Sequence, residues 1–238
     1  MTPQAAQLRR REEIAAGTMA FHFEKPSGFG FKPGQAIDLV LPEPPTADAQ
    51  SARHTFSIVS APFEAELTIA TRMRDSAFKH ALKSLPIGTQ VAIEGPFGSL
   101  TLHGDRTRPA VFIAGGIGIT PFMSMLRQAH HDRLPRALVL LYSNRRPDDS
   151  AYLTELQHLA RDNLFFRLLA TMTQPADPRW TGQTGLIDSA LLRAAAAELS
   201  APTYYVAGPP AMVQAMRDTL NGAGVNDDDI RSEDFYGY

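Results

Sequence analysis

The stretch Val111-Phe-Ile-Ala-Gly115-Gly116-Ile-Gly118-Ile-Thr120-Pro121 decides the fold of this chain. Its apolar start predicts a buried strand, the glycines predict a sharp turn, and Thr-Pro suits the first turn of a helix. Such a unit directs free backbone N–H groups and the positive end of a helix dipole at one point, where an anion can bind. The stretch therefore indicates a dinucleotide pyrophosphate site, and the alternative is a tight turn with no ligand.

Composition narrows the classes of function. The 238 residues include 44% hydrophobic and 20% charged residues, which is typical of a globular protein with room for two domains. The net charge of −2 provides no basic field for nucleic acid or an anionic membrane, so neither is an expected partner. The chain has no cysteine, which excludes disulfides and four-cysteine iron–sulfur clusters. Any redox chemistry must then come from a bound organic cofactor.

Targeting and metal signals are also absent from the sequence. No apolar run of about 18 residues occurs and the start lacks a signal-peptide core, so we expect a cytoplasmic protein without a membrane span. The seven histidines show no ligand-like spacing, and we expect no metal site.

The hydrophobic pattern changes near position 105. Before it, short alternating segments predict an antiparallel barrel or sandwich with one helix at about 76–84. The predicted strands are Met19 onward, Gln35–Leu41, Thr55–Ser60, Glu66–Arg72 and Gln90–Glu94. From Pro109, apolar strands at 110–114, 137–142, 164–170 and 203–207 alternate with helices at 119–130, 149–161, 188–199 and 209–222. This alternation predicts a parallel sheet covered by helices. We expect an antiparallel β-barrel domain over 1–106 and an α/β nucleotide-binding domain over 107–238.

The barrel segment holds two groups of candidate binding residues. Arg53, Thr55, Phe56 and Ser57 supply a cation, hydroxyls and an aromatic ring, which suit a flat ring system with a phosphate tail. A plain amphipathic strand is the alternative. Arg72 and Arg74 precede Ser76 at the start of the predicted helix and suggest a second anion site. There the alternative is Asp75 or Ser76 as a simple helix cap.

Six motifs, in order along nearly the whole chain, resemble the ferredoxin–NADP reductase family. They are Pro33-Gly34-Gln35, Phe56-Ser-Ile-Val-Ser60, Gly95-Pro96-Phe97-Gly98, Gly115-Gly116-Ile-Gly118-Ile-Thr120-Pro121, Gly208-Pro209-Pro210 and Glu233-Asp-Phe235-Tyr-Gly-Tyr238. The resemblance implies a flavin barrel followed by a pyridine-nucleotide domain, with FAD exchanging electrons between NADPH or NADH and a second redox partner.

The same resemblance implies roles for individual residues. Arg53, Thr55, Phe56, Ser57, Arg72, Arg74 and Ser76 would bind the flavin nucleotide, and Gly115, Gly116, Gly118, Thr120, Pro121, Gly208, Pro209 and Pro210 the nicotinamide nucleotide. The family's arginine lies two residues before the strand's aromatic residue, whereas Arg53 precedes Phe56 by three. Either this strand bulges or Arg53 is not the phosphate ligand. Where many members have a cysteine this chain has Ala207, which leaves Ser57 and Glu233 as the catalytic candidates near flavin N5.

One further segment bears on the choice of coenzyme. Ser143, Asn144, Arg145 and Arg146 follow the second predicted strand of the nucleotide domain, and arginine there suits the 2′-phosphate of NADPH. Tyr238 is expected to cover the flavin face as a displaceable ring.

Without a cysteine-rich extension the chain resembles the bare reductase module, so electrons would leave to a separate acceptor protein, such as ferredoxin or flavodoxin, or to a small redox acceptor. The alternative is a non-catalytic subunit of a redox complex that only senses nucleotide.

Overall fold

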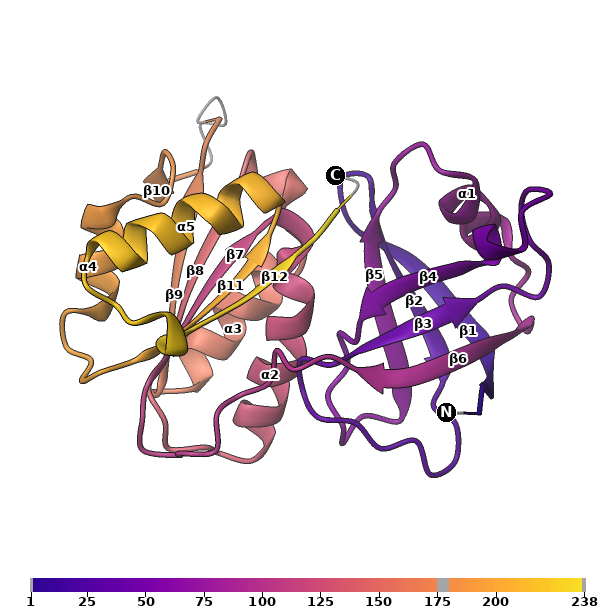
Figure 1. Ribbon diagram of the computed structural model, residues 1–238, viewed down its shortest axis with the longest axis horizontal. Coiled ribbons are helices and arrows are strands. Elements are labelled where there is room, and N and C mark those ends of the chain that lie inside the picture. The colour runs from indigo at the N-terminus through magenta and orange to yellow at the C-terminus, as the bar shows by residue number, and fades with distance from the viewer. Residues whose placement is uncertain (1, 175–179, 237–238) are drawn as a thin grey trace. The chain divides into compact units, whose positions relative to one another are not determined.

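The computed structural model of the protein describes residues 2–174 and 180–236 (Figure 1). Contacts between Cα atoms divide the chain into two compact units. The first contains Met1–Thr101 and Thr120–Gln128, and the second contains Leu102–Ile119 and Ala129–Tyr238. The boundary at 106 and 107 stays a prediction, since residues 120–128 group with the first unit.

The first unit is built on a six-stranded antiparallel sheet in the order β4-β3-β6-β1-β2-β5. Its elements are β1 (Gln4–Ala15), β2 (Thr18–Glu24), β3 (Ala36–Val40), η1 (Ala49–Ala52), β4 (Arg53–Ser57), β5 (Glu66–Arg72), α1 (Ala77–Ser84) and β6 (Gln90–Phe97). An antiparallel bridge joins Ile58, just after β4, to Ile69 of β5. Because β4 and β5 are the two edges of the sheet, this bridge closes it, and the predicted antiparallel barrel is confirmed.

Strand β1 was not predicted from the sequence. It pairs with β2 and β6 over most of its length, yet only Ala6 and Leu8 are buried in the core. Most of the other residues are polar or charged, with Arg9 to Glu13 in one run, so the strand lacks the alternation by which a half-buried strand is predicted.

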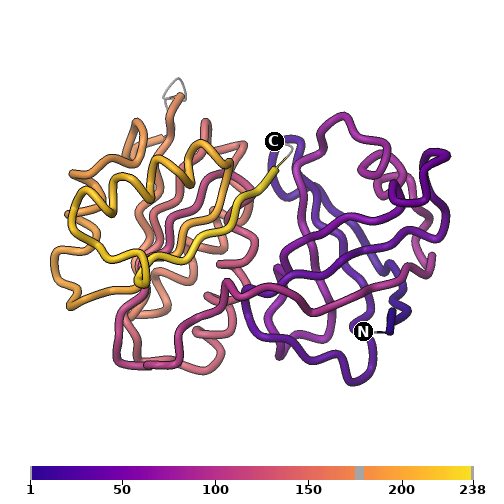
Figure 2. The backbone as a smooth tube through the Cα atoms, viewed as in Figure 1, coloured from indigo at the N-terminus to yellow at the C-terminus, as the bar shows by residue number. Residues whose placement is uncertain are grey.

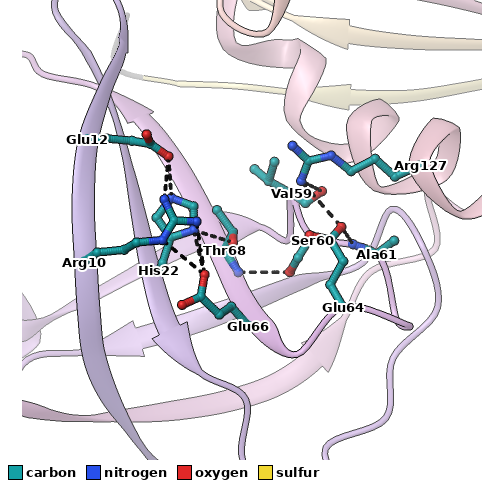
Figure 3. Close-up of polar contacts among 10 residues, drawn as sticks. All are labelled: Arg10, Glu12, His22, Val59, Ser60, Ala61, Glu64, Glu66, Thr68 and Arg127. Atoms are coloured by element: carbon teal, nitrogen blue, oxygen red, sulfur yellow. Dashed lines mark hydrogen bonds and ion pairs between the residues drawn. The ribbon is translucent and has the colours of Figure 1, made fainter. Parts of the chain in front are cut away.

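Helix α2 (Thr120–His131) is attached to the barrel by polar contacts within the first unit. The buried Ser124 hydroxyl donates a hydrogen bond to the Ser60 carbonyl over 2.7 Å. Arg127 lies 3.5 Å from a carboxylate oxygen of Glu64 and contacts the Val59 carbonyl (Figure 3). The segment that follows β4 therefore fixes the helix that follows the glycine-rich stretch.

The second unit is built on a parallel sheet in the order β10-β9-β8-β7-β11-β12. Its strands are β7 (Ala110–Gly115), β8 (Leu138–Asn144), β9 (Phe166–Met172), β10 (Gln183–Thr184), β11 (Thr203–Gly208) and β12 (Ile230–Asp234). Its helical segments are η2 (Gly116–Ile119), η3 (Pro147–Asp149), α3 (Leu153–Asp162), α4 (Ser189–Ala196), α5 (Pro210–Gly222) and η4 (Asp227–Asp229). Helix α5 crosses in front of the sheet in Figure 1 and packs on β11 and β12. The parallel sheet with helices is thus confirmed.

Two features of this unit differ from the sequence-based prediction. Strand β12 was not predicted because only Ile230 of its residues is buried, but it runs beside β11 (Figure 2). The helix predicted over 149–161 begins at Leu153, because η3 and a left-handed Tyr152 (φ 60°) precede it. No helix within 2–174 and 180–236 combines the length and apolar character needed to cross a membrane.

Candidate functional site

Arg53 lies on the outer face of β4, where it binds two carboxylates. Its guanidinium donates hydrogen bonds to Asp38 on β3 over 2.9 Å and to both carboxylate oxygens of Glu94 on β6 over 2.6 and 2.7 Å. The hydrogen bonds to Glu94, and then that to Asp38, raise the pKa of Arg53, and the bond from Arg53 lowers the pKa of Glu94. Strand β4 pairs with β3 in continuous register, without a bulge. Arg53 and Phe56 therefore point to opposite faces of β4.

The other face of β4 carries a stacked pair of rings, His54 and Phe56, with the Phe78 ring of α1 tilted against both. The His54 ring lies 4.6 Å from the Phe56 ring at 18°, and Phe78 of α1 lies 5.3 and 5.8 Å from these two rings. Phe56 and Phe78 belong to the barrel core. His54 occupies the position two residues before the aromatic residue, where the family resemblance places an arginine.

Ser57 ends β4 with a buried hydroxyl. Its Oγ atom has no hydrogen-bond partner among the described residues. Such a group costs about 1–3 kcal/mol when it stays unpaired, so it is suited to a polar ligand. Thr55, by contrast, donates its hydroxyl hydrogen bond to Asp38.

The start of α1 brings several cations together. Arg72 ends β5, exposed Arg74 follows, and Ser76 is the N-cap residue but makes no capping hydrogen bond with its side chain. The first turn of α1 contains no acidic residue. It contains Lys79, which is 6% exposed and which the motifs in the sequence did not predict as a site residue. A lysine in a first helical turn, contrary to the dipole rule, was the signal that could have identified it.

The glycine-rich stretch forms a tight connection from β7 through η2 to α2. Gly116 has a left-handed φ of 54°, and a Cβ atom there would meet no atom within 4 Å. Gly118 packs so closely on the end of β11 that a Cβ atom would lie 2.2 Å from the Ala207 carbonyl oxygen. Thr120, which is buried, and Pro121 open α2 directly afterwards. The backbone is therefore open to a ligand at Gly116 and tightly packed at Gly118.

The carboxyl ends of the central strands lie at one edge of the second sheet. Gly115 pairs with Ser143, Ala207 with Ala114 and Gly208 with Asp234. Gly208 has a φ of 157°, and Pro209 and Pro210 follow it at the start of α5. This edge is where open parallel sheets bind ligands.

Asn144 and its neighbours extend the same edge. Asn144 is buried, and its Nδ2 atom has no hydrogen-bond partner among the described residues. Arg145 and Arg146 are both exposed, and Arg146 binds Asp149, whose carboxylate is buried. Asp149 is a further residue that the sequence analysis missed.

Glu233 lies on β12 directly beside Ala207 of β11. Glu233 is half-buried, and this partial burial raises its pKa, which favours its neutral, proton-bearing form. The predicted residue Tyr238 lies outside the described residues. Within 2–174 and 180–236 no group of three or more side chains suits a metal ion.

Residues 112–218 match the family model of the oxidoreductase NAD-binding domain. Ferredoxin–NADP reductase B of Sorangium cellulosum is 31% identical over 230 residues, which cover 92% of each protein. The reductase component of propane 2-monooxygenase from Rhodococcus jostii is 29% identical over 218 residues, covering 89% of this chain and 57% of that relative. This chain thus spans less than two thirds of the oxygenase reductase component.

Among solved structures, a ferredoxin NADP⁺ reductase from Neisseria gonorrhoeae with bound FAD and NADP has the same fold. The TM-score is 0.81 at 20% identity, and the similarity covers 98% of this chain and 99% of that one.

Proposed function

The chain belongs to the ferredoxin–NADP reductase family, and from that premise we propose that it is an FAD-dependent NAD(P)H oxidoreductase that passes electrons to a separate acceptor. The observation that carries the proposal is the edge of the parallel sheet. There an open left-handed Gly116 and the unpaired amide of Asn144 lie on neighbouring strand ends. A glycine loop that precedes a helix, with a free donor beside it, suits a dinucleotide.

The residues of the first unit fit the flavin. The buried, unpaired hydroxyl of Ser57 offers a hydrogen bond to a ring heteroatom. Thr55 and Phe56 lie on the same strand, and the Arg72, Arg74 and Ser76 group at the start of α1 offers cations and backbone N–H groups to phosphates. When bound, FAD accepts a hydride from the nicotinamide and delivers the electrons to the acceptor.

The residues of the second unit fit the nicotinamide nucleotide. Gly115, Gly116, Gly118, Thr120 and Pro121 would hold the pyrophosphate, and Gly208, Pro209 and Pro210 would border the nicotinamide. Ser143, Asn144, Arg145 and Arg146 would contact the adenosine half. Two arginines at this strand end favour the 2′-phosphate of NADPH over the hydroxyl of NADH.

Ser57 and Glu233 are the proposed catalytic side chains. The Ser57 hydroxyl can hold a hydrogen bond to the reacting nitrogen of the flavin. Glu233, whose pKa burial raises, can keep a proton at neutral pH more readily than an exposed glutamate. The acceptor would be a ferredoxin, by analogy with the ferredoxin–NADP reductase relative, or else a flavodoxin or another electron-transfer partner.

The test is reconstitution and reduction. The purified chain should bind FAD with a visible flavin spectrum, and NADPH added without oxygen should bleach that spectrum. Adding ferredoxin or ferricyanide should restore the colour. A protein that stays colourless with excess FAD, or whose flavin neither NADPH nor NADH bleaches, would contradict the proposal and favour a non-catalytic nucleotide-sensing subunit.

A further inference from the structure

Lys79 is a buried lysine near the start of α1. It is the third residue of α1 and is only 6% exposed. Side chains of a helix lean toward its N-terminus, so the Lys79 ammonium group is expected near the start of α1. No described residue gives the Lys79 side chain a hydrogen bond or an ion pair. A buried charge in a folded protein is ordinarily paired, so the missing partner requires an explanation.

The basic groups near Lys79 add to the local positive charge and do not neutralise it. Exposed Arg74 lies just before the helix, and the first turn of α1 contains no acidic side chain. The N-terminus of a helix is itself positive and ordinarily attracts Asp or Glu. Burial lowers the pKa of Lys79, and the nearby Arg74 charge lowers it further. Arg74 and buried Lys79 thus place like charges near each other, while the neighbouring carboxylate of Asp75 is fully exposed and lies 3.7 Å from the His80 ring. Such a local conflict is characteristic of a binding site.

His54, on β4, lies beside the start of α1. Its ring stacks on that of Phe56 and lies 5.3 Å from the ring of Phe78. Phe78 is the residue just before Lys79 in the sequence. Burial lowers the pKa of His54, and the Lys79 charge contributes to the lowering. The Lys79 charge therefore acts on His54, and the Arg74 charge acts on Lys79, around the N-terminus of α1.

Arg53 does not belong with Lys79, His54 and Arg74 because of its position on β4. It lies on the opposite face of β4 and is held by Asp38 and Glu94 with three hydrogen bonds. Turning it to the Phe56 face would leave both carboxylates without their cation.

We infer that Lys79, with His54 and Arg74, forms the cationic subsite for the pyrophosphate of the flavin nucleotide, and that Arg53 is a structural clamp on Asp38 and Glu94. The inference rests on the proposed function. It replaces the strand arginine with a helix lysine as the cation that binds phosphate. A ligand of two linked phosphates supplies the negative charge that this cluster lacks, and a charged hydrogen bond explains the burial of Lys79.

The test compares FAD with riboflavin, which has the same ring system but no phosphate. Dissociation constants for both are measured by flavin fluorescence on apoprotein of the wild type, Lys79→Met and Arg53→Met, and the melting temperature of each apoprotein is recorded. Methionine keeps an unbranched side chain of similar length without the charge. Lys79→Arg, which keeps the charge, serves as the rescue variant.

Lys79→Met should weaken FAD binding about tenfold to a hundredfold, which is the range for a hydrogen bond to a charged group. Its affinity for riboflavin should be unchanged, and its apoprotein should melt at the same temperature or higher because a buried unpaired charge is gone. Lys79→Arg should recover most of the FAD affinity. Arg53→Met should show the opposite pattern, with a lower melting temperature and an unchanged ratio of FAD to riboflavin affinity.

Two results would overturn the inference in distinguishable ways. If the wild type binds FAD more tightly than riboflavin and Lys79→Met keeps that ratio, the subsite is wrong while the proposed function stands. If the wild type binds neither FAD nor riboflavin, the proposed function fails and the subsite fails with it.

Discussion

The guanidinium of Arg146 donates two hydrogen bonds to the carboxylate of Asp149, from Nε over 3.0 Å and from Nη2 over 3.2 Å. The Asp149 side chain is 2% exposed, whereas that of Arg146 is 54% exposed. Nε of Arg145 lies 4.0 Å from the same carboxylate. A buried carboxylate thus orients an exposed guanidinium just past the end of β8, where the ribose of a bound coenzyme is expected.

Replacing both arginines tests the choice of coenzyme. In Arg145→Ala, Arg146→Ala, the ratio of kcat/KM for NADPH to that for NADH should fall about tenfold or more, because a 2′-phosphate loses its charged hydrogen bonds. The matched control is Arg193→Ala, an exposed arginine on α4. An unchanged ratio in the double variant would show that these arginines do not select the coenzyme.

Gly118→Ala tests the close packing of the glycine loop. The added Cβ atom would lie 2.2 Å from the Ala207 carbonyl oxygen and 2.7 Å from the Gly208 nitrogen, and since these are backbone atoms, one segment must shift. We expect a loss of about 1–3 kcal/mol in the free energy of unfolding and weaker binding of NADP⁺. Urea unfolding and a NADP⁺ titration measure the two effects.

The control is Gly222→Ala at the end of α5, where a Cβ atom meets nothing within 4 Å. It should leave stability unchanged or raise it by up to about 1 kcal/mol. Equal behaviour of the two variants would mean that the contact of Gly118 with β11 does not matter.

Glu233 should make stability depend on pH. Burial raises its pKa in the folded protein above the ordinary 4.5, so folding favours the protonated form. Its favourable contribution is present below pH 4.5 and is lost as the pH rises through the folded-state pKa. Glu233→Gln should therefore unfold at a higher urea concentration than the wild type at pH 8, and the difference should shrink toward pH 4.

The matched control for this measurement is Glu198→Gln, which removes an exposed carboxylate. It should show little difference at either pH. A Glu233→Gln variant that gains no stability at pH 8 would contradict the role assigned to burial.

The flavin should be bound without a covalent bond. The chain has no cysteine, and no histidine occupies a position that the family uses for attachment. Acid or heat precipitation of the reconstituted protein should release all FAD into the supernatant, as measured by absorbance. Flavin that stays with the precipitated polypeptide would disprove this prediction.

Removal of Tyr238 tests the ring that the family resemblance places over the flavin. An offset ring stack is worth roughly 0.5–1.5 kcal/mol, which incoming nicotinamide can displace. The truncated protein should bind NAD(P)⁺ more tightly and emit stronger flavin fluorescence, while turnover falls or stays level because product leaves more slowly. If neither affinity nor emission changes, some other group covers the flavin.

Most of the architecture could be predicted from the sequence, because periodicity and turn residues are local features of the chain. Periodicity along the chain reports which side of an element is buried, so the alternating strands before position 105 and the apolar strands after it were recognisable. The glycines of Val111–Pro121 were equally recognisable, since a left-handed Gly116 followed by a helix start is a local property. Even the odd spacing between Arg53 and Phe56 already raised the question of whether Arg53 binds phosphate.

The contacts that each side chain makes with distant residues could be read only from the three-dimensional structure. Asp38 and Glu94 reach Arg53 from β3 and β6 because the register of a barrel brings distant strands together. Strands β1 and β12 carry few buried residues, and their hydrogen bonds to neighbouring strands define them instead. The burial of Lys79 likewise depends on how α1 packs against the rest of the barrel unit. Contacts between residues far apart in the chain have no local signal, and for that reason only the fold distinguishes the clamp at Arg53 from the free charge at Lys79.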